Sequence, residues 1–315
     1  MKKLVLATKR RWNWRVFLVL VGLIIPAVLA ILPFEISRQR TYLGTDVIAS
    51  LGWGTILLDR LINILLIALL GALGLVLANR IGLGLPFIQG WIRHEPIAYQ
   101  FQTIVAIAWI TAVLLELSSL FARTLVIDPP MNSMFEQLGI TKPSDAAAPP
   151  LHGFLASISA GINEEIQFRL FGLSLLAWLG GLLFHDPSGR PKAIVLWAAN
   201  ILLAVGFGAA HLPTAATLGL PMNALVIGST LFVNGIAGLA FGWLFWTFGL
   251  ESAILAHCLA DVIVYTLIPL IALQDGELAR SIATAGVAAV ILSGLIWAVR
   301  SLVTERREHQ LHSVP

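Results

Sequence analysis

The chain has 315 residues, of which 58% are hydrophobic and 12% are charged, and its mean hydropathy is +0.87. A water-soluble domain of this length could not expose such a composition, so the sequence predicts an integral membrane protein. The net charge of +3 comes from Lys and Arg that flank apolar runs, which orients membrane proteins and gives no indication of nucleic-acid binding. A single cysteine, Cys258, excludes an internal disulfide and a Cys-rich metal site.

Apolar runs long enough to cross the hydrocarbon of a bilayer, about 20 residues each, recur along the whole chain. The sequence therefore predicts an all-α fold, an integral membrane helical bundle of about eight transmembrane helices. We divide it into residues 1–150 (helices 1–3 and a loop), residues 151–273 (a core of helices 4–7) and residues 274–315 (the last helix and a tail). The runs are Val16–Leu32, Leu61–Ala78, Phe101–Phe121, Leu151–Phe184, Ala193–Ala210, Ala224–Trp246, Ser252–Leu273 and Ile282–Val299.

The segments outside the runs indicate orientation. The first run follows a cluster of Lys and Arg and is longer than the apolar part of a usual signal peptide, so we interpret it as an uncleaved anchor. The bias of Lys and Arg between alternate loops predicts a multi-pass protein of the cell membrane with both termini in the cytoplasm. The longest connection, Arg123–Pro150, is rich in Pro and polar residues and predicts a loop or a lid.

A few ionisable residues lie inside the predicted spans, where lipid cannot solvate them. A charged side chain at mid-bilayer costs roughly 2.5 to 3.5 kcal/mol, so these groups must face one another or a hydrated cavity. They are Glu164, Glu165 and Arg169 in the fourth run, His211 at the end of the fifth, and His257 and Asp261 in the seventh.

Helical spacing predicts how these residues pair. Glu165 and Arg169 are four residues apart, on one face and within salt-bridge reach, whereas Glu164 points about 100° away from that face. Such a pair on its own is as often structural as functional. His257 and Asp261 have the same spacing, so the carboxylate could hold the imidazole or share a bound species with it.

The loop between the fourth and fifth runs predicts that the groups meet. If His185–Lys192 is the turn of an antiparallel hairpin, Glu164 and His211 lie at similar distances from it on facing helices. Small residues in the sixth run would let the neighbouring helices approach closely. These are Gly235, Gly238 and Gly242.

Two chemistries fit this set of residues. Glu164 could act as a general base on water, assisted by His211, while His257 stabilises the oxyanion that forms on the attacked carbonyl. Alternatively, Glu164, His211 and His257 could bind Zn²⁺, with Asp261 as a fourth ligand or a neighbouring group, and leave one position open for water. The chain has no GxSxG and no HExxH sequence, which excludes the usual serine and zinc protease signatures.

Three motifs in this order resemble a known family. EEIQFR (with Glu164, Glu165 and Arg169), FGAAH (with His211) and HCLAD (with His257 and Asp261) are similar to those of the CPBP intramembrane proteases. That family unites the type II CAAX prenyl endopeptidases with bacterial bacteriocin-processing and immunity (Abi) proteins. The resemblance covers about Leu151–Leu273.

The resemblance implies an intramembrane endopeptidase, often labelled a metalloprotease, that cleaves near the membrane-anchored end of a peptide or protein within the bilayer. Glu164 and His211 would act on water, Glu165 and Arg169 would orient the site, and His257 and Asp261 would line the oxyanion side. The prenyl endopeptidases typically have Asn at the last position, and an ionised Asp cannot donate a hydrogen bond. At Asp261 a metal-ligating or His-orienting role is therefore favoured.

The alternative is a non-hydrolytic membrane protein, either a bacteriocin self-immunity factor or a proton-coupled transporter. Buried carboxylates and histidines also form proton relays, so the inventory of charged residues permits it. Against a transporter, the two halves of the chain show no inverted repeat and no paired broken helices. The oligomeric state does not follow from the sequence.

Overall fold

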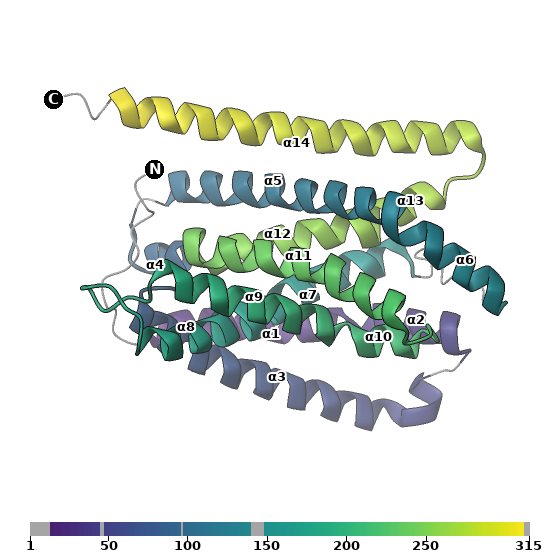
Figure 1. Cartoon of the computed structure of the whole chain (residues 1–315), viewed down its shortest axis with the longest axis horizontal. Helices are drawn as coiled ribbons and strands as arrows, with labels where there is room; N and C mark the ends of the chain where they lie inside the picture. The colour runs from purple at the N-terminus through teal and green to yellow at the C-terminus, as the bar shows by residue number, and fades with distance from the viewer. Residues whose placement is uncertain (1–12, 45–46, 96, 140–147, 312–315) are drawn as a thin grey trace.

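The described part of the chain is almost entirely helical. The computed structural model describes residues 13–44, 47–95, 97–139 and 148–311, and within these ranges short turns and loops and an isolated β-bridge connect the helices. This confirms the all-α prediction. Figure 1 shows long helices lying side by side, with α14 along one edge of the bundle and α3 along the opposite edge. The elements are α1 (Trp14–Ala30), α2 (Leu32–Leu43), α3 (Val47–Ile81), α4 (Pro86–Ile92), α5 (Ala98–Ala122), η1 (Arg123–Ile127), α6 (Asp128–Leu138), α7 (Pro150–Glu165), η3 (Ile166–Leu173), α8 (Ser174–Gly181), α9 (Ala193–Ala210), α10 (Leu212–Thr217), α11 (Ala224–Phe248), α12 (Leu250–Val262), η4 (Ile263–Leu267), α13 (Ile268–Ala272) and α14 (Glu277–Leu311).

Among the described residues, seven helical stretches are long and apolar enough to cross a membrane. They correspond to seven of the expected spans, and the protein is a multi-pass membrane protein. The basic residues before the first span, from Lys2 to Arg11, lie outside the described residues. The seven stretches are Trp14–Thr41, Ser50–Ile81, Phe101–Leu138, Ala193–Thr217, Ala224–Phe248, Leu250–Ala272 and Glu277–Thr304.

The remaining expected span, Leu151–Phe184, is helical from Pro150 to Gly181 as the consecutive elements α7, η3 and α8. Its helix starts at Pro150, a position where the missing N–H of proline costs no hydrogen bond. The stretch is less apolar than the other seven because Glu164, Glu165 and Arg169 lie at its centre. It is therefore the span that most needs partners inside the bundle.

The turn between α8 and α9 closes the predicted hairpin. His185 and Pro191 form an antiparallel bridge, and the Asp186 N–H donates to the Arg190 carbonyl over 2.8 Å. The Asp186 carboxylate accepts hydrogen bonds from the Ser188 hydroxyl and from the backbone N–H groups of Ser188 and Arg190. These bonds lower the pKa of Asp186, because they favour its ionised form. The turn predicted at His185–Lys192 is confirmed.

The helices that carry the site approach one another at small residues. A Cβ on Gly238 would lie 3.0 Å from the Ala204 Cα, and one on Gly242 would collide with the Asn200 side chain, so α11 packs directly on α9. This confirms the close approach predicted for Gly238 and Gly242, whereas at Gly235 an added Cβ would make an ordinary contact. The chain is thus folded so that polar groups on neighbouring helices come within reach of one another.

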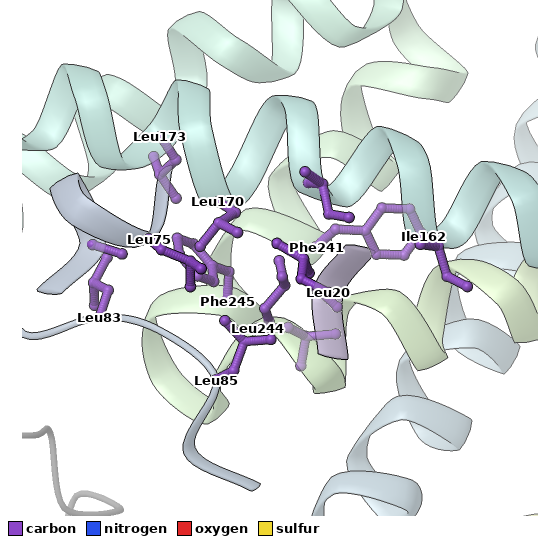
Figure 2. Close-up of a cluster of buried hydrophobic side chains, with 14 of the residues drawn as sticks. Leu20, Leu75, Leu83, Leu85, Ile162, Leu170, Leu173, Phe241, Leu244 and Phe245 are labelled. Carbon is purple, nitrogen blue, oxygen red and sulfur yellow. The ribbon is translucent and has the colours of Figure 1, made fainter. Parts of the chain in front are cut away.

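A continuous apolar core runs through the bundle beside the site. Leu20 of α1, Leu75 of α3, Leu170 of η3 and Phe241 and Phe245 of α11 are buried together in one cluster, shown in Figure 2. Helices from both the first and the second predicted segment therefore share this core. Many leucines on the outer faces remain exposed, as expected for a surface that contacts lipid.

The segment Arg123–Pro150 is more helical than the ordered loop or lid predicted from its Pro and polar content. Its first part is helical, as η1 and α6, and Met131 and Phe135 of α6 pack against Ala215 of α10 and Val226 of α11. The two prolines of α6 lie in its first turn, where the helix tolerates them, which is why they do not prevent it. The loop prediction is wrong for residues 123–138, and residues 140–147 lie outside the described residues.

Three short segments of the described residues have π-helical rather than α-helical hydrogen bonding. One, η3, begins directly after Glu165, and another, η4, begins two residues after Asp261. Insertions of this kind are rare, change the direction of the following side chains and occur frequently at functional sites. The sequence predicts regular α-helices in both spans, and neither π segment follows from its pattern of apolar residues.

Candidate active site

The pair Glu165 and Arg169 forms the buried base of the site. The Arg169 Nη1 donates to the Glu165 Oε1 over 3.0 Å, and the side chains are 4% and 0% exposed, respectively. The Arg169 Nη2 also donates to the Gly238 carbonyl of α11 over 3.1 Å. The predicted salt bridge is confirmed, and it attaches the fourth span to α11 at the point where α11 packs on α9.

His257 of α12 binds to the same carboxylate oxygen. Its Nδ1 lies 2.8 Å from the Glu165 Oε1. Because an ionised carboxylate only accepts, the imidazole N–H must be on Nδ1, and the ring orientation is then fixed with Nε2 pointing away from Glu165. Glu165 therefore both neutralises Arg169 and orients His257, a link across two spans.

Two further carboxylates face the other nitrogen of His257. The Nε2 lies 3.6 Å from the Asp261 Oδ2 and 4.0 Å from the Glu164 Oε2. The His257 side chain is 6% exposed, whereas those of Asp261 and Glu164 are 22% and 31% exposed. One side of the imidazole is therefore closed by Glu165, and the other faces a more open region lined by acids. The different directions predicted for Glu164 and Glu165 are confirmed.

Aromatic rings connect His211 and Arg169 to this group. Phe207 contacts the His211 ring edge-on at 4.9 Å and the His257 ring at 5.8 Å, and the Arg169 guanidinium lies 4.4 Å above its centroid. The His211 Nδ1–H donates to the Phe207 carbonyl over 2.8 Å, which leaves Nε2 of His211 as the unprotonated nitrogen of the neutral ring. His211 thus joins the site through Phe207, and its direct approach to Glu164 stays a prediction from the hairpin.

The zinc alternative can be tested against the donor atoms. In the described part of the chain, no group of three or more His, Cys, Asp and Glu side chains is arranged to hold a metal ion. The bond of the His211 Nδ1 to a carbonyl leaves its Nε2 free, and Glu164 and Asp261 lie 4.0 and 3.6 Å from the His257 Nε2. Zinc binding by these side chains stays a prediction from the sequence.

The close contact between α7 and α12 depends on Gly161. A Cβ there would collide with the Cys258 sulfur and lie 3.0 Å from the Ile254 carbonyl. Cys258 fills the space beside this glycine, and its neighbour His257 is directed toward Glu165. The register of the two helices, and hence the bond between Glu165 and His257, is set by this packing.

Two residues of the site were missed in the sequence. Phe241 of α11 stacks on the His257 ring with centroids 4.7 Å apart, and nothing in its sequence context distinguishes it from other apolar residues of that span. Glu116 of α5 interacts electrostatically with Asp261. Glu116 lies within the apolar run Phe101–Phe121, so an acid inside a predicted span is the sequence signal that points to it.

Residues 146–263 match the family model described as type II CAAX prenyl endopeptidase Rce1-like. The matched range contains all six charged and imidazole residues singled out above, together with Phe207 and Phe241. No curated protein and no solved structure matches the chain.

Proposed function

We propose, from the match of residues 146–263 to the type II CAAX prenyl endopeptidase Rce1-like family, that the protein is an intramembrane endopeptidase that uses Glu164 to activate water. It hydrolyses a peptide bond near the membrane-anchored end of a protein or peptide. The observation that carries the proposal is the separation of 4.0 Å between the Glu164 Oε2 and the His257 Nε2, with Glu165 holding the other nitrogen of the same imidazole.

This separation suits a water molecule as the nucleophile. It is too long for a direct hydrogen bond, but one water can bond to both atoms at about 2.8 Å each. Glu164 would take a proton from that water as the oxygen attacks the scissile carbonyl, and would deliver it to the leaving amine when the C–N bond breaks. His211, through the nitrogen that its bond to Phe207 leaves free, would assist Glu164.

His257 would stabilise the tetrahedral intermediate. In its protonated form the Nε2–H points toward the open side of the site and can donate to the oxyanion. Glu165 fixes this direction through its bond to Nδ1, and Arg169 balances the charge of Glu165. Asp261, which as an ionised carboxylate cannot donate, would hold the imidazolium from the side of the Nε2.

Zinc binding by Glu164, His211, His257 and Asp261 stays a prediction from the sequence. Zinc would polarise the carbonyl and lower the pKa of a bound water, but the arrangement of these side chains does not favour it and we derive no step through it. Metal analysis of the purified protein decides the question.

The substrate that we propose is anchored to the membrane, since the site lies within spans that only such a chain can reach. A prenylated protein with a CAAX carboxyl terminus is the first to assay, because of the family model that the chain matches. We further propose that the protein resides in the cell membrane with both termini in the cytoplasm. The Lys and Arg bias supports that orientation, as does the even number of passes when α7 to α8 is counted with the other seven.

The proposal is tested by cleavage in proteoliposomes that contain the protein and a membrane-tethered peptide in H₂¹⁸O. We expect the new carboxyl terminus to carry ¹⁸O, and Glu164→Gln to lower the rate by roughly 10²- to 10⁴-fold, as for the loss of a general base. The matched control is Glu251→Gln, which alters another buried glutamate of the bundle, where the amide oxygen can still accept from the Ile88 N–H. Unchanged turnover in Glu164→Gln, with wild-type expression and folding, would remove the proposed base.

A further inference from the structure

Phe241 lies opposite His257 because of the turn that joins their helices. α11 ends at Phe248, Gly249 takes the positive φ of +99°, and α12 begins at Leu250. Phe241 and His257 are equally far from Gly249 along the chain, so an antiparallel pair of helices brings them to the same level. A side chain other than glycine would be strained at this turn, and a Cβ there would also collide with Pro86.

The contact between the two rings is unusually parallel. The planes of Phe241 and His257 differ by 15° with centroids 4.7 Å apart, whereas Phe207 meets the same imidazole at 80°. Phe241 is 1% exposed, and the Arg169 guanidinium lies 5.5 Å from the centroid of its ring. One phenyl ring therefore covers a face of the imidazole and also borders the cation that balances Glu165.

The role of His257 requires that its imidazole keep one orientation. Its two nitrogens must point in opposite directions, toward Glu165 on one side and toward Glu164 and Asp261 on the other. Rotation of the ring about its bond to Cβ would break the bond to Glu165 and move Nε2 away from the acids. A flat ring packed against one face prevents this rotation, while Phe207 blocks the ring from another direction.

We propose that Phe241 is a positioning residue of the reaction: it holds the His257 imidazole in the plane in which Nδ1 meets Glu165 and Nε2 faces Glu164. This inference rests on the proposed hydrolytic function. It goes beyond the charged and imidazole motifs, since Phe241 belongs to none of them. The competing interpretation is that Phe241 only fills the core, as Phe245 does one turn further along the same helix with the same exposed fraction of 1%.

The matched pair Phe241→Met and Phe245→Met separates the two interpretations. Both changes keep an apolar side chain of similar size, so both should lower the stability by a similar amount. We expect Phe241→Met to lower kcat by roughly tenfold to a hundredfold with KM nearly unchanged, because a small displacement of a catalytic group is enough for such a loss. Phe245→Met should lower kcat by less than about threefold, as a change that leaves catalytic geometry intact. Equal kcat values for the two variants overturn the proposal.

A second measurement does not depend on activity. In ¹⁵N-histidine-labelled protein, the Nδ1–H proton of His257, assigned by its loss in His257→Ala, should resonate far downfield because Nδ1 donates to the buried Glu165 carboxylate. We expect Phe241→Met to move this signal upfield or to remove it by exchange with water, because the imidazole is no longer held against Glu165, and Phe245→Met to leave it in place. A signal that stays in place in Phe241→Met overturns the proposal. If wild type does not cleave, the proposed function fails, and the spectra still decide whether Phe241 positions His257.

Discussion

Glu165 is the junction of the site, since a single carboxylate oxygen accepts hydrogen bonds from both Arg169 and His257. Its side chain is fully buried, and its other oxygen has no hydrogen-bond partner within the described chain. A buried charge is tolerated only when its partners remain in place, because desolvation costs several kcal/mol. The position therefore combines a structural role with the orientation of His257.

Removal of the cation tests this dependence. We expect Arg169→Met to lower the free energy of unfolding by about 3 to 5 kcal/mol, because it leaves the buried Glu165 without its balancing charge. The free energy of unfolding is measured by denaturation in mild detergent. The double variant with Glu165→Gln should recover part of the loss, since it removes the charge that Arg169 balances. A loss below about 1 kcal/mol in the single variant would contradict the account.

At the residue scale, the sequence predicts the contacts between side chains of the same helix. The pairings of Glu165 with Arg169 and of His257 with Asp261 follow from the rise and twist of an α-helix, and both are found. The bond from His257 to Glu165 could not be predicted, because it depends on how far α12 is rotated against α7. That rotation is set by the packing of Cys258 on Gly161, which has no signature in the local sequence.

At the scale of the elements, α9 and α11 pack closely against each other at small residues. Gly238 and Gly242 bring α11 against Ala204 and Asn200, and the Asn200 side-chain amide donates to the Leu239 carbonyl over 2.9 Å. The same stretch of α11 carries Phe241, and its Gly238 carbonyl accepts from Arg169. A change in the spacing of these helices would therefore reach the site directly.

Two glycines of α11 provide a paired test of this packing. We expect Gly242→Ala to lower the free energy of unfolding by about 1 to 3 kcal/mol, because the added methyl group collides with Asn200. Gly228→Ala is the control, since nothing lies within 4 Å of the added Cβ. It should be neutral or stabilise the helix by up to about 1 kcal/mol. Thermal unfolding in detergent measures both, and equal effects would show that the close approach does not matter.

The elements that the sequence does not predict are the π-helical segments and α6. Their formation depends on more than the residues of the segment itself. Regular apolar runs predict spans, but they do not indicate that hydrogen bonding changes to the π pattern after Glu165 and near Asp261. Pro129 and Pro130 favour a loop at the position of α6. Its stability comes from the packing of Met131 and Phe135 on a distant part of the chain, which no local rule describes.

At the scale of the whole molecule, the charged side chains of the membrane-spanning helices are paired with one another inside the bundle. Its outer faces are apolar, and the acids and the arginine of the fourth and seventh spans meet inside the bundle instead of facing lipid. Exposed to lipid, each would cost roughly 2.5 to 3.5 kcal/mol. This cost predicts from the sequence alone that the charged groups converge, although it does not predict which nitrogen meets which carboxylate.

The central claim is that Glu164 of α7 and His257 of α12 act as one catalytic unit, and a double-mutant cycle on cleavage of a membrane-tethered peptide tests it most directly. We expect Glu164→Gln and His257→Ala each to lower kcat/KM by about 100-fold or more, and the double variant to be little worse than the weaker single variant. If instead the two losses multiply, or if either single variant retains wild-type activity, the two residues do not work together and the account is contradicted.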